Sequence, residues 1–215
     1  MMTGSYYSQQ YWTHCFVPEG RGARPLFPCN DDRVRFPSLL VEAGVPTVHY
    51  GQAVWCLNKY GLVRGFSEER HFPPKKGEPS TKGKWSNGDV VVDAMIARLQ
   101  KHGDGPLFMF FHDLDPHAPF DLGAVKTGSH RDRYLSEVDL SDARLGRLRA
   151  AVEEAGLADR TIFILTADHG EAFDEHGTSF HGQNLYDEQV RVPLVIHVPS
   201  MAARRVDTPV TLMDV

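Results

Sequence analysis

The chain has 215 residues, of which 41% are hydrophobic and 24% are charged, and its formal net charge is −5. This composition suits one or two globular domains with a real core and argues against a disordered or fibrous protein. The chain has no clustered stripe of Lys and Arg, so we exclude a nucleic-acid-binding protein, which needs concentrated positive charge to neutralise phosphates.

The cysteines and the first residues say little about compartment. Cys15, Cys29 and Cys56 show no Cys-x-x-Cys spacing, so neither a zinc knuckle nor a full disulfide framework is predicted, and a single Cys15–Cys29 bridge stays open. No apolar run approaches the ~20 residues of a membrane span, and the start lacks a signal peptide's basic and apolar regions. The localisation therefore stays unknown, and we expect membrane contact only through segments absent from this sequence.

The first half of the chain alternates loops with short elements. Residues 1–36 show no hydrophobic period and predict a loop with short helical turns. Residues 36–44 predict a short helix, with Pro37 in its first turn and Gly44 as its stop, and a strand over Pro46–Tyr50 follows. Residues 71–88 concentrate Pro, Gly, Lys and Ser and predict an exposed loop.

The second half predicts longer elements. Apolar residues at helical spacing indicate helices over residues 89–102 and 134–155, and the charged residues of the longer helix are expected on its solvated face: Glu137, Asp142, Arg144, Arg147 and Arg149. Apolar runs predict three strands: Pro106–His112, Thr161–Thr166 and Val192–Val198. A last helix is expected to begin within Thr208–Val215. This alternation predicts an α/β fold, with a mainly parallel sheet and helices on both faces.

Polar residues follow two of the predicted strands. Asp168 and His169 come directly after Thr161–Thr166, and His117 lies in HDLDPHAPF after Pro106–His112. The carboxyl ends of parallel strands share one edge of a sheet, where ligands bind, so we expect these residues to gather there with His112, Asp113 and Asp115. An Asp and a His side by side suit a divalent cation, although an isolated Asp-His-Gly is more often a helix cap and a loop residue.

A resemblance to a known family rests on two consecutive segments. ADHGEAFDEHG, then HGQNLYDEQVRVPLVIHVPS, resembles the C-terminal half of the catalytic domain of sulfatases, within the alkaline phosphatase superfamily. The resemblance covers nearly the whole chain and implies the alkaline phosphatase/sulfatase-like fold in incomplete form. Met1-Met2-Thr3-Gly4 resembles the segment just after the family's nucleophile, so residues 1–215 are expected to be a partial catalytic domain, a fragment without that nucleophile.

The resemblance implies a role for each candidate residue. Asp168 and His169 would bind a divalent cation, for which calcium is the family expectation and manganese or zinc is compatible. His117 and His181 would contact the tetrahedral anion of the substrate. Glu171 is left outside the predicted site, together with Glu175 and His176: the two carboxylates either orient His169 or His176, or are exposed loop carboxylates, the commoner case.

One departure from the family pattern keeps alternatives open. Many sulfatases have Gly-Lys-Trp-His where this chain has Gly51-Gln52-Ala53-Val54-Trp55, so the basic pair is missing. The leading hypothesis is a metal-dependent sulfuric ester hydrolase acting on small-molecule or glycan sulfate esters, inactive as this fragment alone. A phosphodiesterase or phosphoethanolamine transferase of the same superfamily is the first alternative, and a non-catalytic remnant or interaction module is the second.

Overall fold

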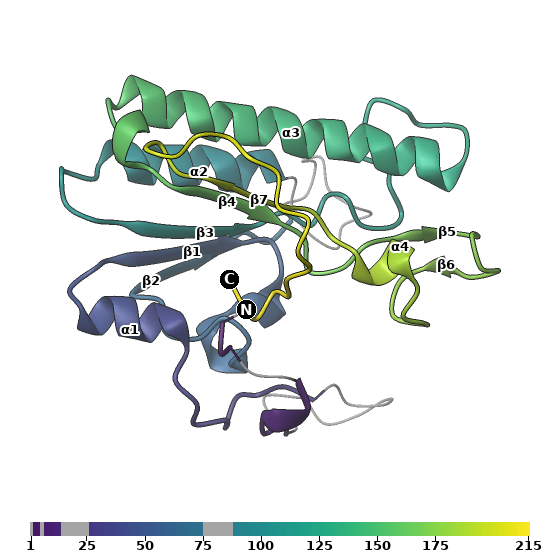
Figure 1. Cartoon of the computed structure of the whole chain (residues 1–215), viewed down its shortest axis with the longest axis horizontal. Helices are drawn as coiled ribbons and strands as arrows, with labels where there is room; N and C mark the ends of the chain where they lie inside the picture. The colour runs from purple at the N-terminus through teal and green to yellow at the C-terminus, as the bar shows by residue number, and fades with distance from the viewer. Residues whose placement is uncertain (1, 5–6, 14–25, 75–87) are drawn as a thin grey trace. The chain divides into compact units, whose positions relative to one another are not determined.

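Figure 1 shows the computed structural model of the chain, which describes residues 2–4, 7–13, 26–74 and 88–215. The chain divides into two compact units, Met1–Leu114 with Val210–Val215 and Asp115–Pro209. Cys15 lies outside the described residues, so the possible Cys15–Cys29 bridge does too. Residues 75–87, most of the predicted exposed loop, also lie outside them.

The first unit is built on a three-stranded parallel sheet in the order β2-β1-β3 (Figure 1). Strands β1 (Thr47–Gly51) and β3 (Phe108–His112) confirm two predicted strands, and β2 (Glu68–His71) was not predicted. The sequence of β2, EERH, has no apolar alternation. An edge strand can be polar because one of its sides is not covered by another strand, so periodicity alone does not detect it.

Two predicted helices pack on the central strand of this sheet. Helix α1 (Phe36–Glu42) and helix α2 (Gly88–Gln100) both contact β1. Every residue of β1 is buried, as expected for a parallel strand covered on both faces. Gly44, with φ +79°, follows the end of α1, and this left-handed conformation explains why the helix stops at a glycine.

The core of the first unit contains a buried histidine. His49 on β1 is 1% exposed, and its ring packs against the rings of Phe66 and Phe110, with centroid distances of 5.3 and 5.5 Å. Neither ring nitrogen has a hydrogen-bond partner among the described residues. Burial, helped by the nearby His112, lowers the pKa of His49 to about 4, so this side chain is neutral at pH 7.

The second unit contains the longest helix, α3 (His130–Glu154). The helix begins with a capping box: the Ser129 side chain accepts from the backbone N–H of Asp132, and the Asp132 carboxylate accepts from the backbone N–H of Ser129. Gly156, with φ +69°, follows its last turn. The predicted helix and its glycine stop are therefore confirmed, and the helix begins four residues earlier than predicted.

The two remaining predicted strands pair with each other, but antiparallel. Strand β4 (Phe163–Thr166) pairs with β7 (Leu194–His197) in the register Ile164↔Ile196. Between them lie only the short hairpin β5 (Ala172–Phe173) and β6 (Ser179–Phe180) and the single turn of α4 (Asp187–Val190). A parallel return needs a long crossover, usually a helix, and this connection has none. The expectation of a parallel arrangement was wrong for this pair.

The predicted helix at Thr208–Val215 is also wrong. Thr211 and Asp214 form a local turn, in which the Asp214 carboxylate accepts from the backbone N–H and the hydroxyl of Thr211. Side-chain bonds of this kind compete with helix formation, and eight residues are too few to nucleate a helix without packing. No helix among the described residues combines the length and apolarity that crossing a bilayer requires.

Candidate functional site

All four residues predicted for the site lie in the second unit. His117 lies in the loop that begins this unit, Asp168 and His169 follow the end of β4, and His181 follows the end of β6. His117 and Asp168 are more than 45 residues apart in the sequence. Only the folding of this unit brings their segments together.

Three imidazole rings form a contiguous cluster with His181 at its centre. The ring of His169 stacks on that of His181 with a centroid distance of 4.0 Å and an interplanar angle of 29°. The ring of His117 meets the ring of His181 edge-on, with a centroid distance of 5.1 Å. Sequence reasoning predicted these three histidines for one site, and the structure places them side by side.

Asp168 and His169 present two donor atoms that suit one cation. Oδ2 of Asp168 and Nε2 of His169 are 3.8 Å apart. Nδ1 of His169 lies 2.8 Å from the carbonyl oxygen of Gly170, which can only accept, so Nδ1 carries the hydrogen and Nε2 keeps the lone pair that a metal needs. No group of three or more His, Cys, Asp or Glu side chains among the described residues is arranged to hold a metal. The two donors fit a divalent cation as part of a ligand set.

Sequence reasoning missed Glu171. Its carboxylate oxygens both lie 3.2 Å from Nδ1 of His181, and its side chain is 4% exposed. We expected this carboxylate either in solvent or beside His169 or His176. The pairing Ala172↔Phe180 in the β5–β6 hairpin instead makes Glu171 and His181 the next facing positions, so the register of the hairpin was the missing signal.

His176 belongs to a different pair. Its Nδ1 lies 2.8 Å from Oε1 of Glu188, and its ring stacks on Tyr186 with a centroid distance of 3.8 Å. The partners of His176 are therefore Glu188 and Tyr186, outside the cluster of His117, His169 and His181.

The loop that carries His117 is bound to α3 through buried polar contacts. Asp115 and Arg144 form an ion pair of 2.5 Å, and both side chains are at most 2% exposed. Oε1 of Glu137 accepts from the backbone N–H of Leu122 at 2.7 Å. Further contacts tie Arg133 to the carbonyl of Pro119 at 3.1 Å and Ser136 to the backbone N–H of Val125 at 2.9 Å.

These contacts correct three expectations. Asp115 is 0% exposed and does not join the predicted cluster at the sheet edge, and Glu137 and Arg144, at 0% and 1%, are not on a solvated face. A helix presents charged residues to its interior side when each can be paired or hydrogen-bonded there, since an unpaired buried charge is costly. Periodicity counts apolar residues and so could not distinguish this polar, buried face from a solvated one.

Glu137 is a buried carboxyl group beside this loop, and its pKa is raised. Burial raises the pKa to about 7, the hydrogen bonds from the backbone N–H groups of Leu122 and Gly123 offset part of this shift, and the negative charges of Asp115 and Asp121 add to it. Oε2 of Glu137 is buried and has no hydrogen-bond partner among the described residues.

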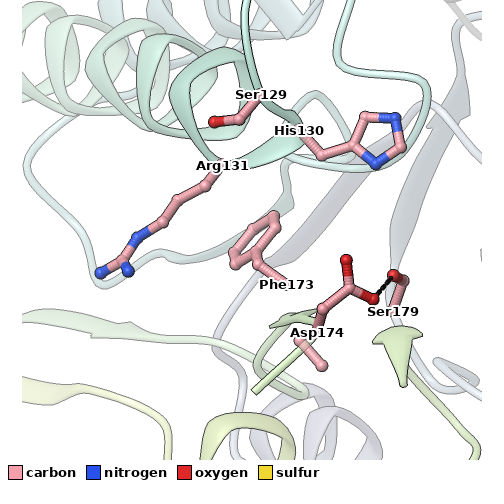
Figure 2. Close-up of a pocket in the computed structure, with 7 residues that line it drawn as sticks. Ser129, His130, Arg131, Phe173, Asp174 and Ser179 are labelled. Carbon is pink, nitrogen blue, oxygen red and sulfur yellow. Dashed lines mark hydrogen bonds between the residues drawn. The ribbon is translucent and has the colours of Figure 1, made fainter. Parts of the chain in front are cut away.

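A cavity of about 260 Å³ lies between the start of α3 and the β5–β6 hairpin (Figure 2). The Ser179 hydroxyl donates to the Asp174 carboxylate at 2.5 Å. Figure 2 draws this hydrogen bond and the ring of Phe173 near it. The residues that line the cavity are mostly polar: Ser129, His130, Arg131, Ala172, Phe173, Asp174 and Ser179. Glu171 directly precedes Ala172 of the lining, and His181 lies two residues after Ser179.

The departure at Gln52 has a structural explanation within the first unit. Gln52 is 2% exposed, and its side-chain oxygen accepts from the backbone N–H of Leu114 at 2.8 Å. His112 and Asp113 belong to the same unit, where Nδ1 of His112 lies 3.9 Å from Sγ of Cys56.

Many known proteins are similar to this chain, among them two human sulfatases and one solved structure. Human arylsulfatase D is 29% identical over 141 residues, which are 59% of this chain and 24% of that protein. Human iduronate 2-sulfatase is 38% identical over 73 residues, which are 34% of this chain and 13% of that protein. The structure of Ps i-CgsB in complex with k-i-k-neocarrahexaose has a TM-score of 0.66 at 20% identity, covering 99% of this chain and 57% of that chain. The chain thus spans less than a quarter of the length of these two human relatives.

The fold is the α/β fold of the alkaline phosphatase superfamily. The sulfatase family profile matches residues 1–215, and the chain belongs to the sulfatase family.

Proposed function

We propose that the chain is the part of a metal-dependent sulfuric ester hydrolase that binds the cation and the sulfate group. The observation that carries this proposal is the cluster of His117, His169 and His181, contiguous with Asp168, in a chain of the sulfatase family. Carboxylate and imidazole donors suit the cation, and imidazole N–H groups suit a tetrahedral anion.

Each residue has a distinct task in the proposed reaction. Asp168 and His169 hold a divalent cation, calcium by family expectation, and manganese or zinc is compatible with the same donors. A cation bound there supplies Lewis-acid stabilisation of the ester's anionic oxygens. His117 and His181 donate hydrogen bonds to the sulfate group. One of them gives a proton to the departing alcohol oxygen as the enzyme's nucleophile forms its bond to sulfur and the S–O bond to the alcohol breaks.

The proposed substrate is a sulfate ester of a small molecule or a glycan. The names of the relatives support this class, since one is an iduronate 2-sulfatase and one neighbour in fold holds a neocarrahexaose. A mostly polar cavity beside the β5–β6 hairpin also suits the hydroxyl groups of a sugar, because Asp174, Arg131 and Ser129 offer acceptors and donors.

A phosphoester substrate is the second candidate. Two observations favour it: Gln52 takes the place of a lysine that many sulfatases have, and its side chain is engaged with the backbone of Leu114. Phosphate and sulfate esters are both tetrahedral and anionic, so the His117–His181 pair suits either group.

The decisive experiment identifies the nucleophile and then compares substrates. We would sequence the transcript around the Met1 codon, express its longest open frame with a formylglycine-generating enzyme, and measure turnover of 4-methylumbelliferyl sulfate against 4-nitrophenyl phosphate and its diester. We expect preferred turnover of the sulfate ester. Preferred turnover of a phosphoester would overturn the assignment in favour of the second candidate.

Two variants test the assigned site in the same assay. We expect H181A to lower kcat/KM by roughly 10²–10⁴-fold, as for loss of an acid–base group. H176A is the matched control, because His176 lies on the same hairpin segment and pairs outside the cluster with Glu188. Equal losses in the two variants would show that His181 has no special role.

A further inference from the structure

We propose that Glu171 is the positioning residue of this site: its carboxylate fixes the ring of His181 so that Nε2 is the nitrogen presented to the bound anion. The inference rests on the proposed function for the identity of the anion. The assignment of the nitrogen rests on the geometry of Glu171 and His181 alone.

The hydrogen bond between the two side chains determines where the imidazole carries its proton. Both carboxylate oxygens of Glu171 lie 3.2 Å from Nδ1 of His181. An ionised carboxylate only accepts hydrogen bonds, so Nδ1 must donate. No hydrogen bond to Nε2 of His181 is present among the described residues, which leaves this nitrogen for a ligand. Nε2 accepts when the ring is neutral and donates when the ring is protonated, so the same atom faces the ligand in both states.

The burial of Glu171 makes this pairing obligatory. The Glu171 side chain is 4% exposed, and within the described part of the chain His181 is its hydrogen-bonding partner. A buried carboxylate without a partner is strongly destabilising, so the two groups hold each other in place.

The hairpin explains why the pair is rigid. Strands β5 and β6 pair through Ala172↔Phe180 and Phe173↔Ser179, and Glu171 and His181 flank this ladder directly. Rotating the His181 ring away from Glu171 would also disturb its stacking on His169, at a centroid distance of 4.0 Å. Glu171 therefore acts on the anion through His181 and touches neither the substrate nor the cation.

A second His–carboxylate pair provides a matched control. His176 and Glu188 form a hydrogen bond of 2.8 Å in the same unit, and the His176 side chain is 46% exposed. Substituting Glu188 removes the same kind of interaction from a histidine outside the cluster.

The first test measures histidine tautomers by long-range ¹H–¹⁵N NMR in the 215-residue protein. We expect His181 in the wild type to carry its hydrogen on Nδ1, E171A to shift it to the Nε2–H form that free imidazole favours, and E171Q to give a mixture. E188Q should change His176 and leave His181 as in the wild type. Retention of the Nδ1–H form in both E171A and E171Q would overturn the proposal.

The second test measures turnover in the catalytically active protein. Loss of a group that orients a ligand typically lowers affinity or activity by 10–100-fold, so we expect a loss of about that size in kcat/KM for E171A and a smaller loss for E171Q. E188Q should stay within about twofold of the wild type. A changed His181 tautomer with unchanged turnover would overturn the role of Glu171 in the site.

The NMR result does not depend on the substrate, so failure of the sulfatase assignment is recognised separately. E171Q keeps the side-chain volume and distinguishes loss of orientation from loss of folding.

Discussion

At the scale of single residues, the site depends on what an imidazole can do that an ammonium group cannot. The resemblance to the sulfatase family implies that His181 stands where that family has a lysine or a histidine. A lysine only donates, whereas the Nε2 atom of His181 can donate or accept while Nδ1 is held by Glu171. His169 is held in the same way, because its Nδ1 donates to the carbonyl of Gly170 and its Nε2 faces Asp168.

The cation assignment can be tested at the residue level. Two protein donors imply weak binding by this chain, so we would titrate Mn²⁺ and follow paramagnetic broadening of NMR signals. Broadening should be strongest at Asp168 and His169, should be reversed by excess Ca²⁺, and should be lost in D168A because an anionic donor is removed. The exposed carboxylate of Asp159 provides the control variant D159A. Identical broadening in D168A and the wild type would contradict the assignment.

At the scale of an element, α3 is the support of the His117 loop. Arg133, Ser136, Glu137 and Arg144 recur at spacings of three, one and seven residues, which places them along one face of the helix. All four contact the loop that starts at Asp115. The buried polar face of α3 thus determines the position of His117. Substitutions on this face should therefore alter the position of His117, although they lie far from the site.

Glu137 predicts a pH dependence of stability. Its folded-state pKa is raised from 4.5 to about 7, so the folded protein binds this proton more tightly than the unfolded chain does. The corresponding stabilisation is fully present below about pH 4.5 and is lost as pH rises through about 7. The free energy of unfolding should therefore fall across this range by an amount on the order of 3 kcal/mol from this group.

The variant E137Q isolates this effect. A glutamine can still accept the hydrogen bond from Leu122 and cannot ionise beside Asp115 and Asp121. Urea unfolding at pH 5 and pH 8 should show a larger loss of stability in the wild type than in E137Q, and E137Q should be the more stable protein at pH 8. The exposed Glu154 on the same helix supplies the control E154Q. Parallel pH profiles for the wild type and E137Q would show that Glu137 is ionised at little cost in the folded protein.

At the scale of the whole molecule, the predicted site residues all belong to one unit, whereas the parallel sheet belongs to the other. The second unit presents an apolar pair of strands: Ile164, Leu165, Val195 and Ile196 on β4 and β7 are 44–56% exposed. Exposed apolar strands favour association between molecules.

We therefore expect the 215-residue protein in isolation to self-associate. The double variant I164T/I196T replaces a cross-strand pair with residues that keep a high strand propensity, and it should shift the protein towards monomer. Sedimentation velocity at several concentrations measures this shift. L185T, at a single loop position that is 86% exposed, is the control and should have little effect. A wild-type protein that stays monomeric at all concentrations would contradict the prediction.

The sequence alone was enough to predict the class of fold and the main helices and strands, and it supplied the four residues proposed for the candidate site. Apolar periodicity predicted α2 and β3 because buried faces must be apolar, and the Asp-His-Gly and Asp-Pro-His motifs predicted Asp168, His169 and His117 because those residue types suit cations and anions. The polar edge strand β2 was missed because it carries no apolar period.

Which side chains face one another could not be predicted from the sequence. The antiparallel return of β7, the pairing of Glu171 with His181, and the burial of Glu137 and Arg144 all depend on contacts between segments distant in sequence. A charged residue on a helix is compatible with both solvent and a paired interior, and its own sequence neighbours do not distinguish the two. The difference lies in whether a partner such as Asp115 is brought within hydrogen-bonding distance, which only the folded chain determines.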